Sequence, residues 1–199
     1  MGEPWNHNIH HHPVVLDALP ADATRALDVG CGAGALTRQL RERVPAVVGL
    51  DLHEPSLGMA VDDAAGTTGL SYVRGDVRQH PFPPSSFDLV ASVAALHHMD
   101  AREGLRAMAD LLRPGGALVV IGLATGHLPR DIPRILGAAV ASRVLAVRHG
   151  GYAEVAAPIV WPPPESYDGM RAIAAEVLPG STFRRHLLWR YSITWTRPA

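Results

Sequence analysis

The stretch ALDVGCGAGALTRQL, residues 26–40, predicts a strand, a tight glycine turn and a helix in succession. A short apolar run ends at Asp28, and the loop that follows places Gly30, Gly32 and Gly34 at alternate positions. Glycine in such a loop lets a ligand approach the backbone, because no side chain stands in the way. The stretch therefore predicts a ligand-binding turn between a strand and a helix.

A dinucleotide is one candidate ligand for this loop. Dinucleotide loops have the spacing Gly-x-Gly-x-x-Gly, with the pyrophosphate at the start of the helix. Here the third glycine, Gly34, comes one residue early, and Ala35 stands at the later position. The spacing favours a ligand without a pyrophosphate.

Two further acidic residues follow predicted strands. Asp51 ends the run VVGLD, and Asp76 lies in VRGDV. The alternation of strands and helices is typical of a parallel sheet, in which ligands bind at the carboxyl ends of the strands. The glycine loop and both acidic residues are therefore expected at one edge of the sheet. The expected strands are 26–29, 46–50, 70–74, 89–93 and 117–123, and the expected helices are 14–19, 35–43, 55–65 and 102–112.

The pattern changes after Gly126. We expect an apolar helix over 133–147, a stiff proline-rich loop over 158–165 and a second helix over 165–178. Residues 182–197 hold two runs that predict a closing strand pair, and RPGG, before the strand at 117–123, predicts a turn.

Composition excludes several functional classes. The 199 residues suffice for one domain, and the net charge of −1 gives no strong attraction to nucleic acid or anionic lipid. The single Cys31 excludes an internal disulfide, and we expect it to fill the tight turn rather than to react. No signal peptide is visible, and no apolar run approaches the roughly 20 residues that span a bilayer. We expect a cytoplasmic protein with no nucleic-acid and no membrane partner.

Five motifs over residues 27–123 carry a family resemblance: LDVGCGAG, VVGLD, VRGDV, FDLVASVAALHHM and LLRPGGALVVIGL. The chain resembles the class I S-adenosylmethionine-dependent methyltransferases. The opening WNHNIHHHP and the closing RRHLLWRYSITWTRP are similar to a subgroup of small bacterial members, of the methyltransferase type 11/25 kind. The resemblance implies an α/β fold: a Rossmann-like, seven-stranded, mostly parallel sheet with helices on both faces and an antiparallel last strand.

The resemblance also implies an activity. The expected reaction is methyl transfer from S-adenosylmethionine to a small-molecule acceptor in specialised metabolism, with S-adenosylhomocysteine as the product. An NAD(P)-dependent oxidoreductase and a non-catalytic, S-adenosylmethionine-binding regulatory subunit stay open as alternatives.

By this resemblance, Asp28 and the backbone of the glycine loop hold the amino-acid end of the cofactor, and Asp51 accepts both ribose hydroxyls. Asp76 accepts from the adenine amine, and Leu52 packs on the ring. The alternative for each acid is an ordinary charge at a strand end or in a loop. The expected cofactor-binding residues are Asp28, Gly30, Cys31, Gly32, Gly34, Asp51, Leu52, Asp76, Val77, Val93, Ala94, His10 and His12.

His97 and His98 follow the predicted strand 89–93, at the edge that borders the methyl group in the family. A neutral imidazole can take a proton from a hydroxyl, amine or thiol nucleophile, so both are candidate catalytic residues. The alternative is that they cap the next helix or pack the loop.

The N-terminal arm is rich in histidine and aromatic residues. We interpret residues 1–20 as a lid that excludes water from the site, with Trp5, His7 and His11 on the substrate side. A metal site is an alternative, because His7 and His11 are four residues apart; a merely structural arm is another. No metal is expected.

The single domain, residues 1–199, then divides into the lid, a cofactor-binding core (26–123), a helical substrate-side region (126–180) and a closing strand pair (181–197). Within the substrate-side region, Trp161 is a candidate substrate contact, and the helix 133–147 is a pocket wall, ordinary core or a homodimer face. Arg184, Arg185 and Arg190 are interpreted as a solvated strand face, and binding of an acidic substrate is the alternative.

Overall fold

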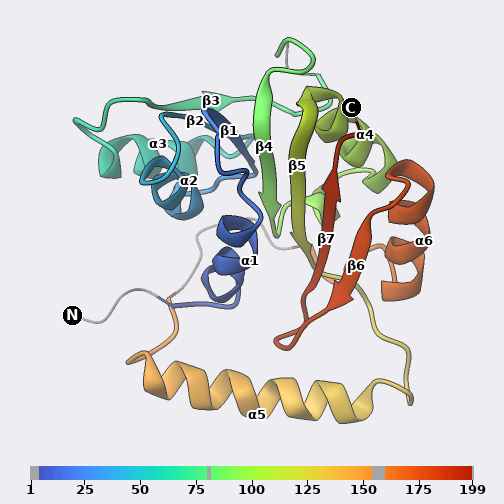
Figure 1. Ribbon diagram of the computed structural model, residues 1–199. Helices are drawn as coiled ribbons and strands as arrows, with labels where there is room; N and C mark the ends of the chain where they lie inside the picture. Colours follow the sequence, from blue (N-terminus) through green and yellow to red (C-terminus); the bar gives the residue numbers. More distant parts are fainter. Residues whose placement is uncertain (1–4, 80–81, 154–159, 199) are drawn as a thin grey trace.

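The glycine stretch folds as its sequence predicts: β1 (Arg25–Val29), a turn, and α2 (Ala35–Arg41). In the computed structural model, which describes residues 5–79, 82–153 and 160–198, this unit starts a seven-stranded sheet (Figure 1). The strand order is β3-β2-β1-β4-β5-β7-β6. The other strands are β2 (Ala46–Asp51), β3 (Leu70–Arg74), β4 (Phe87–Val93), β5 (Leu112–Gly122), β6 (Thr182–Arg185) and β7 (Tyr191–Thr196).

The first five strands are parallel, whereas β7 runs antiparallel to both β5 and β6. Because the chain crosses from β3 to β4 on the far side of β1, the strand order reverses between β1 and β4. Such a reversal leaves a crevice at the carboxyl ends of the two strands. The predicted fold class is confirmed, including the antiparallel last strand.

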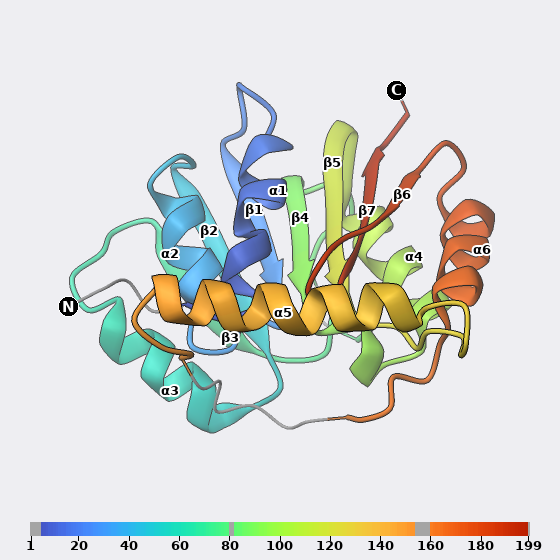
Figure 2. The same ribbon diagram turned by 90° about the horizontal axis from the view of Figure 1, so that it is seen from below.

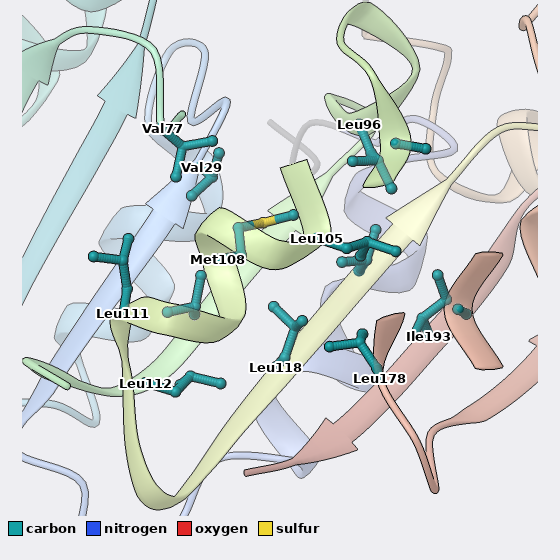
Figure 3. Close-up of a cluster of buried hydrophobic side chains, with 14 of the residues drawn as sticks. Val29, Val77, Leu96, Leu105, Met108, Leu111, Leu112, Leu118, Leu178 and Ile193 are labelled. Atoms are coloured by element: carbon teal, nitrogen blue, oxygen red, sulfur yellow. The ribbon is translucent and has the colours of Figure 1, made fainter. Parts of the chain in front are cut away.

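Helices cover both faces of the sheet. The helical elements are η1 (Ile9–His11), α1 (His12–Asp17), α3 (Glu54–Asp63), η2 (Leu96–His98), α4 (Ala101–Leu111), α5 (Ile132–Arg148) and α6 (Tyr167–Val177). Side chains of α1 and α2 pack on one face of the sheet, and those of α4 and α6 pack on the other. Figure 3 shows part of the second cluster, in which Leu105 and Met108 of α4 lie against Leu118 of β5 and Ile193 of β7.

Several boundaries differ from the prediction by one or two residues, and the starts of β5 and of the N-terminal helix have consequences for the packing. The RPGG segment is not a turn outside the sheet, because β5 already begins at Leu112. Its pairing with β4 shifts register between Phe87 and Leu89, and these two side chains consequently enter opposite core clusters. The N-terminal helix starts at His12 instead of Val14, so three of the histidines belong to helical turns.

Helix α5 lies outside the two layers. It crosses below the carboxyl ends of the parallel strands, as Figures 1 and 2 show from two directions. The β6–β7 hairpin turns at the same edge, beside β5. This edge therefore gathers the glycine loop, the hairpin turn and α5. None of the helices in the described part of the chain has the length and apolar character needed to cross a bilayer.

Candidate functional site

A cavity of about 490 Å³ lies at the carboxyl ends of β1, β2 and β4; we call it the cofactor cavity. Its volume is in the range of small-molecule sites, roughly 300–1,000 Å³. Of the residues expected at the cofactor, Gly34 and His10 do not line it. Those that do are Asp28, Gly30, Cys31, Gly32, Asp51, Leu52, Asp76, Val77, Val93, Ala94 and His12.

Glycine is required at each of the three loop positions for a different structural reason. All have positive φ, but a Cβ on Gly30 would collide with the side chain of Ala95, and one on Gly34 would collide with the hydroxyl of Tyr72. A Cβ on Gly32 would meet no protein atom within 4 Å. The ligand-access argument therefore holds for Gly32, whereas Gly30 and Gly34 accommodate neighbouring protein atoms.

The carboxylate of Asp51 joins the end of β2 to the glycine loop. It accepts the Gly32 N–H at 2.7 Å and the His53 N–H at 2.8 Å. These bonds hold it at the cavity wall, and a carboxylate has further lone pairs for ligand hydroxyls. The position suits recognition of a diol.

Asp28 lies deeper, at the end of β1. It is 1% exposed and accepts a hydrogen bond of 2.7 Å from the hydroxyl of Thr37 on α2. Burial raises its pKa to about 7, and the nearby Asp51 adds to the rise. A carboxyl group in this state favours a cationic ligand group, which would restore its ionised form.

The far end of the cavity combines an apolar surface with Asp76. Leu52 and Met59 line it with 60% and 46% of their surface exposed, so a flat apolar ring has room to pack on them. Arg78 pairs with Asp76 at 2.6 Å and lowers the pKa of that carboxyl. Asp76 is therefore ionised, and it shares its acceptor oxygens between Arg78 and any ligand.

Cys31 is buried in the loop and lines the cavity. Burial raises the pKa of its thiol well above the usual range, so it stays protonated. The structure agrees with a small residue that fills a tight turn.

His97 and His98 lie in η2, with ring centroids 4.2 Å apart. His98 lines the cofactor cavity, whereas His97 lines a neighbouring cavity of about 110 Å³ that shares Met99 with it. Burial lowers the pKa of His97 to about 4, and its buried Nδ1 has no partner among the described residues. At neutral pH His97 is thus an uncharged imidazole whose unpartnered Nδ1 is enclosed by protein, so it is poorly suited to act as a strong base.

A third cavity, of about 480 Å³, lies between α5 and the β6–β7 hairpin; we call it the acceptor cavity. It shares Leu123 with the small cavity of His97, so the three cavities adjoin in series. Trp161, a predicted substrate-side residue, lines this cavity, and residues 158–159 of the expected proline-rich loop lie outside the described residues. Its apolar side chains are Leu123, Leu128, Ile135, Trp161, Tyr167, Leu187 and Trp189.

The hairpin that carries Trp189 is strained. Leu188 and Trp189 both have positive φ, at 61° and 57°, although neither is glycine. Such conformations cluster at ligand sites, where the surrounding structure holds them. Here the turn buries Leu188 completely and directs Trp189 to the acceptor cavity. No sequence signal identified Trp189, because a Leu-Trp pair does not favour this turn.

The N-terminal arm takes a different position from the expected one. Trp5, His7 and His11 line none of the three cavities. Trp5 stacks on His149 just after α5, and its carbonyl accepts the Ala153 N–H at 2.7 Å. His7 bonds the hydroxyl of Ser142 on α5 at 2.8 Å. The arm thus joins α5 to the body of the protein, while His12, bonded to Gln39 at 2.9 Å, reaches the cofactor cavity.

Asn6 and Asn8, for which no role was predicted, hold this arm, Asn8 through a hydrogen bond from Arg190. The Asn6 side chain accepts the N–H groups of Asn8 and Ile9, both at 2.9 Å, and so starts the first helical turn. Asparagine just before a helical pattern is a known start signal and could have identified it. Among the described residues, no cluster of histidine, cysteine and carboxylate side chains could hold a metal ion.

The interpretation of the C-terminal arginines as a solvated face is wrong for two of them. Arg185 pairs with the buried Asp131 at 3.0 Å and lies over the Tyr167 ring. Arg190 is only 7% exposed and donates to the side-chain oxygen of Asn8 at 2.8 Å. Burial lowers the pKa of Arg190 to about 10, but the guanidinium stays charged. It links the strained hairpin to the arm.

The cofactor cavity fits S-adenosylmethionine. Gly32 leaves open space at the backbone, Asp28 suits a cationic amino group, Asp51 suits ribose hydroxyls, and Leu52 with Met59 suits a flat base. A pyrophosphate finds no basic side chain among the lining residues apart from histidines.

Comparisons with known proteins agree with this geometry. Residues 27–120 match the model of a methyltransferase domain family. An uncharacterized methyltransferase of Mycobacterium bovis is 35% identical over 199 residues, which cover 100% of both chains. A malonyl-[acyl-carrier protein] O-methyltransferase of Pseudescherichia vulneris is 36% identical over 104 residues, which cover 52% of this chain and 40% of that one.

Solved structures share the fold. The N-methyltransferase NodS from Bradyrhizobium japonicum superposes with a TM-score of 0.66 at 16% identity, covering 96% of both chains. The Haemonchus contortus phosphoethanolamine N-methyltransferase 2, in complex with phosphomonomethylethanolamine and S-adenosylhomocysteine, gives a TM-score of 0.68 at 15% identity, over 96% of this chain and 53% of that one. With a mycobacterial methyltransferase similar over the full length, and with this fold and cavity, the chain belongs to the class I S-adenosylmethionine-dependent methyltransferases.

Proposed function

We propose that this methyltransferase acts on a small-molecule acceptor whose apolar part lies in the acceptor cavity. One observation carries the proposal: the acceptor cavity adjoins the small cavity of His97, which in turn adjoins the cofactor cavity. On this proposal, a molecule bound between α5 and the hairpin extends a nucleophilic atom past the shared wall residues Leu123 and Met99 towards the cofactor. S-adenosylmethionine, when bound, supplies a methyl group on a positively charged sulfur.

The protein contributes position and exclusion of water. Two aromatic side chains, Trp161 and Trp189, favour an acceptor with a flat or extended apolar body. The neutral His97 ring forms part of the wall of the small cavity that the polar end of the acceptor would enter. Holding the reactants in one orientation can supply about 7–11 kcal/mol of a barrier, so a strong general base is not needed. A role in specialised metabolism stays a prediction.

The lid function of the arm is part of the same proposal. Residues 5–12 contact α5, the hairpin and α2 through His7, Asn8 and His12. Asn6, Asn8 and Ile9 line the cofactor cavity, so opening of the arm would expose the cavity to water.

The test follows the methyl group. Methyl-deuterated S-adenosylmethionine, the full chain and a bacterial metabolite extract are incubated, and label is measured in the low-mass and protein fractions. We expect label in low-mass compounds, a raised KM for the acceptor in Trp161→Ala with S-adenosylhomocysteine binding unchanged, and no turnover in Asp51→Ala. Label confined to protein would contradict a small-molecule acceptor, and an unchanged KM in Trp161→Ala would contradict the acceptor cavity.

A further inference from the structure

The outer side of α5 carries a row of largely exposed aliphatic side chains. Only Ala138 of its 17 residues is buried. Spacings of three and four residues place the row on one side of the helix. We call it the α5 stripe: Ile132, Leu136, Val140, Val144 and Val147, which are 43%, 62%, 66%, 49% and 77% exposed.

The inner side of the same helix is also apolar. Ile135 and Ala138 form part of the wall of the acceptor cavity. Apolar residues therefore lie on both the inner and the outer side of α5, and the outer ones face water at a cost in free energy. The α5 stripe is therefore expected to be covered by a partner.

The charges beside the stripe have one sign. The only charged residues between 132 and 148 are Arg134, Arg143 and Arg148, and all three are exposed. Arg134 lines the acceptor cavity, whereas Arg143, three residues after Val140 and four before Val147, lies on the side of the stripe. Asp131, just before the helix, is buried and paired with Arg185. A protein with a net charge of −1 thus presents a positive, aliphatic surface along α5.

The placement of α5 suits a flat partner. The helix is the outermost layer below the carboxyl edge of the sheet and crosses most of the molecule's width (Figures 1 and 2). Its 17 residues span about 25 Å at 1.5 Å per residue. A planar surface can therefore contact the whole stripe at once.

We propose, contrary to the expectation drawn from the overall net charge, that α5 lies flat on an anionic lipid surface, with the α5 stripe in the acyl boundary and Arg143 and Arg148 at the headgroups. Arginine-rich helices with one aliphatic side bind membranes in this way without crossing them. A second copy of the chain fits less well, because two such helices bring arginines together with no acidic residue on either helix. Bound like this, the acceptor cavity would lie beside molecules dissolved in the membrane, because α5 is its wall.

The experiment is flotation of the full-length chain with vesicles of phosphatidylcholine alone and of phosphatidylcholine mixed with phosphatidylglycerol. We expect binding to the mixed vesicles that weakens as salt is raised. Val140→Asp should weaken vesicle binding about tenfold, because it replaces an apolar side chain that the lipid would bury with a charged one. Arg143→Gln and Arg148→Gln should each weaken it about fivefold.

Val61→Asp is the matched control, because Val61 is an exposed valine (54%) on α3 and is not part of the α5 stripe. This substitution should leave vesicle binding unchanged. Retained S-adenosylhomocysteine binding in every variant shows that the fold and the cofactor site are intact, independently of the acceptor. The proposal is overturned if the chain binds neither kind of vesicle. It is also overturned if light scattering shows a dimer that Val140→Asp dissociates, because the stripe is then covered by a second copy.

Discussion

At neutral pH, Asp28 is close to the midpoint of its titration, because burial raises its pKa. Its pKa of about 7 reflects loss of water around the carboxyl group and the nearby Asp51, only partly offset by the hydrogen bond from Thr37. Below this pKa the group is mostly neutral, and a bound cationic amino group favours the ionised form. Ligand binding and proton release are therefore linked at this residue.

We predict that S-adenosylhomocysteine binds more weakly at about pH 5 than at about pH 8, because binding at low pH must first remove the Asp28 proton. The affinity should change by about tenfold for each unit by which binding lowers the pKa. Calorimetry near neutral pH in two buffers of different ionisation enthalpy measures the released proton. Asp28→Asn should release none, and equal proton release by that variant would assign the effect to another group.

At the level of elements, the arm, α5 and the hairpin form one unit around histidines. This unit contains a connected set of ring contacts among Trp5, His7, His10, His11, His149, Tyr152, His186 and Trp189. Burial lowers the pKa of His7 to about 4 and that of His11 to about 3, and the nearby Arg190 adds to both shifts. The titratable groups that act on these two rings are the cationic Arg190 and other histidines, and no carboxylate is among them. The closed arm therefore requires His7 and His11 to be uncharged.

We predict that the arm opens as pH falls from about 6.5 towards about 4. A histidine in the detached arm binds a proton near pH 6.5, whereas the packed ring does not, so each bound proton favours the open form. Above about pH 7 the histidines are neutral in both forms, and pH has no effect on the opening. Hydrogen exchange of residues 5–17, corrected for the intrinsic rate, measures this opening. The double variant His7→Gln with His11→Gln should flatten the pH response. A response that is unchanged in the double variant would show that other groups control the arm.

At the level of the molecule, two core clusters hold the sheet, while the arm and α5 are attached at its carboxyl edge. The cofactor cavity is bordered by both parts, since Asp28 belongs to the sheet and Asn8 to the arm. A ligand in this cavity contacts β1, β2, β4 and the arm together. Its binding energy should therefore stabilise the whole chain against unfolding.

We predict that S-adenosylhomocysteine at about 100 times its Kd stabilises the chain by about 2.7 kcal/mol. For a chain of this length that amounts to a rise in Tm of about 5–10 °C. Differential scanning calorimetry measures the shift, and Asp51→Asn serves as the control that should show little of it. A similar shift with NAD would contradict the ligand preference inferred from the glycine spacing.

Local sequence patterns predicted the core of this protein well. The glycine loop, the strand-end acids and the alternation of strands and helices depend on neighbours in the chain, so their periodicity and spacing identified β1 to β5 and most of the cofactor-cavity lining. The start of β5 was missed, because pairing of Leu112 with Phe87 and the bulge beside it depend on the neighbouring strand.

What the sequence by itself determined is the fold class, the carboxyl-edge cavity and the family to which the motifs belong. Only the tertiary structure decided that Arg190 is buried against Asn8, that Trp189 faces a cavity, and that Gly30 and Gly34 make room for Ala95 and Tyr72. Asn8 and Arg190 are 182 positions apart, and no local pattern encodes such a contact. Burial and pKa shifts likewise depend on the packing of distant segments, so they arise only when those segments meet.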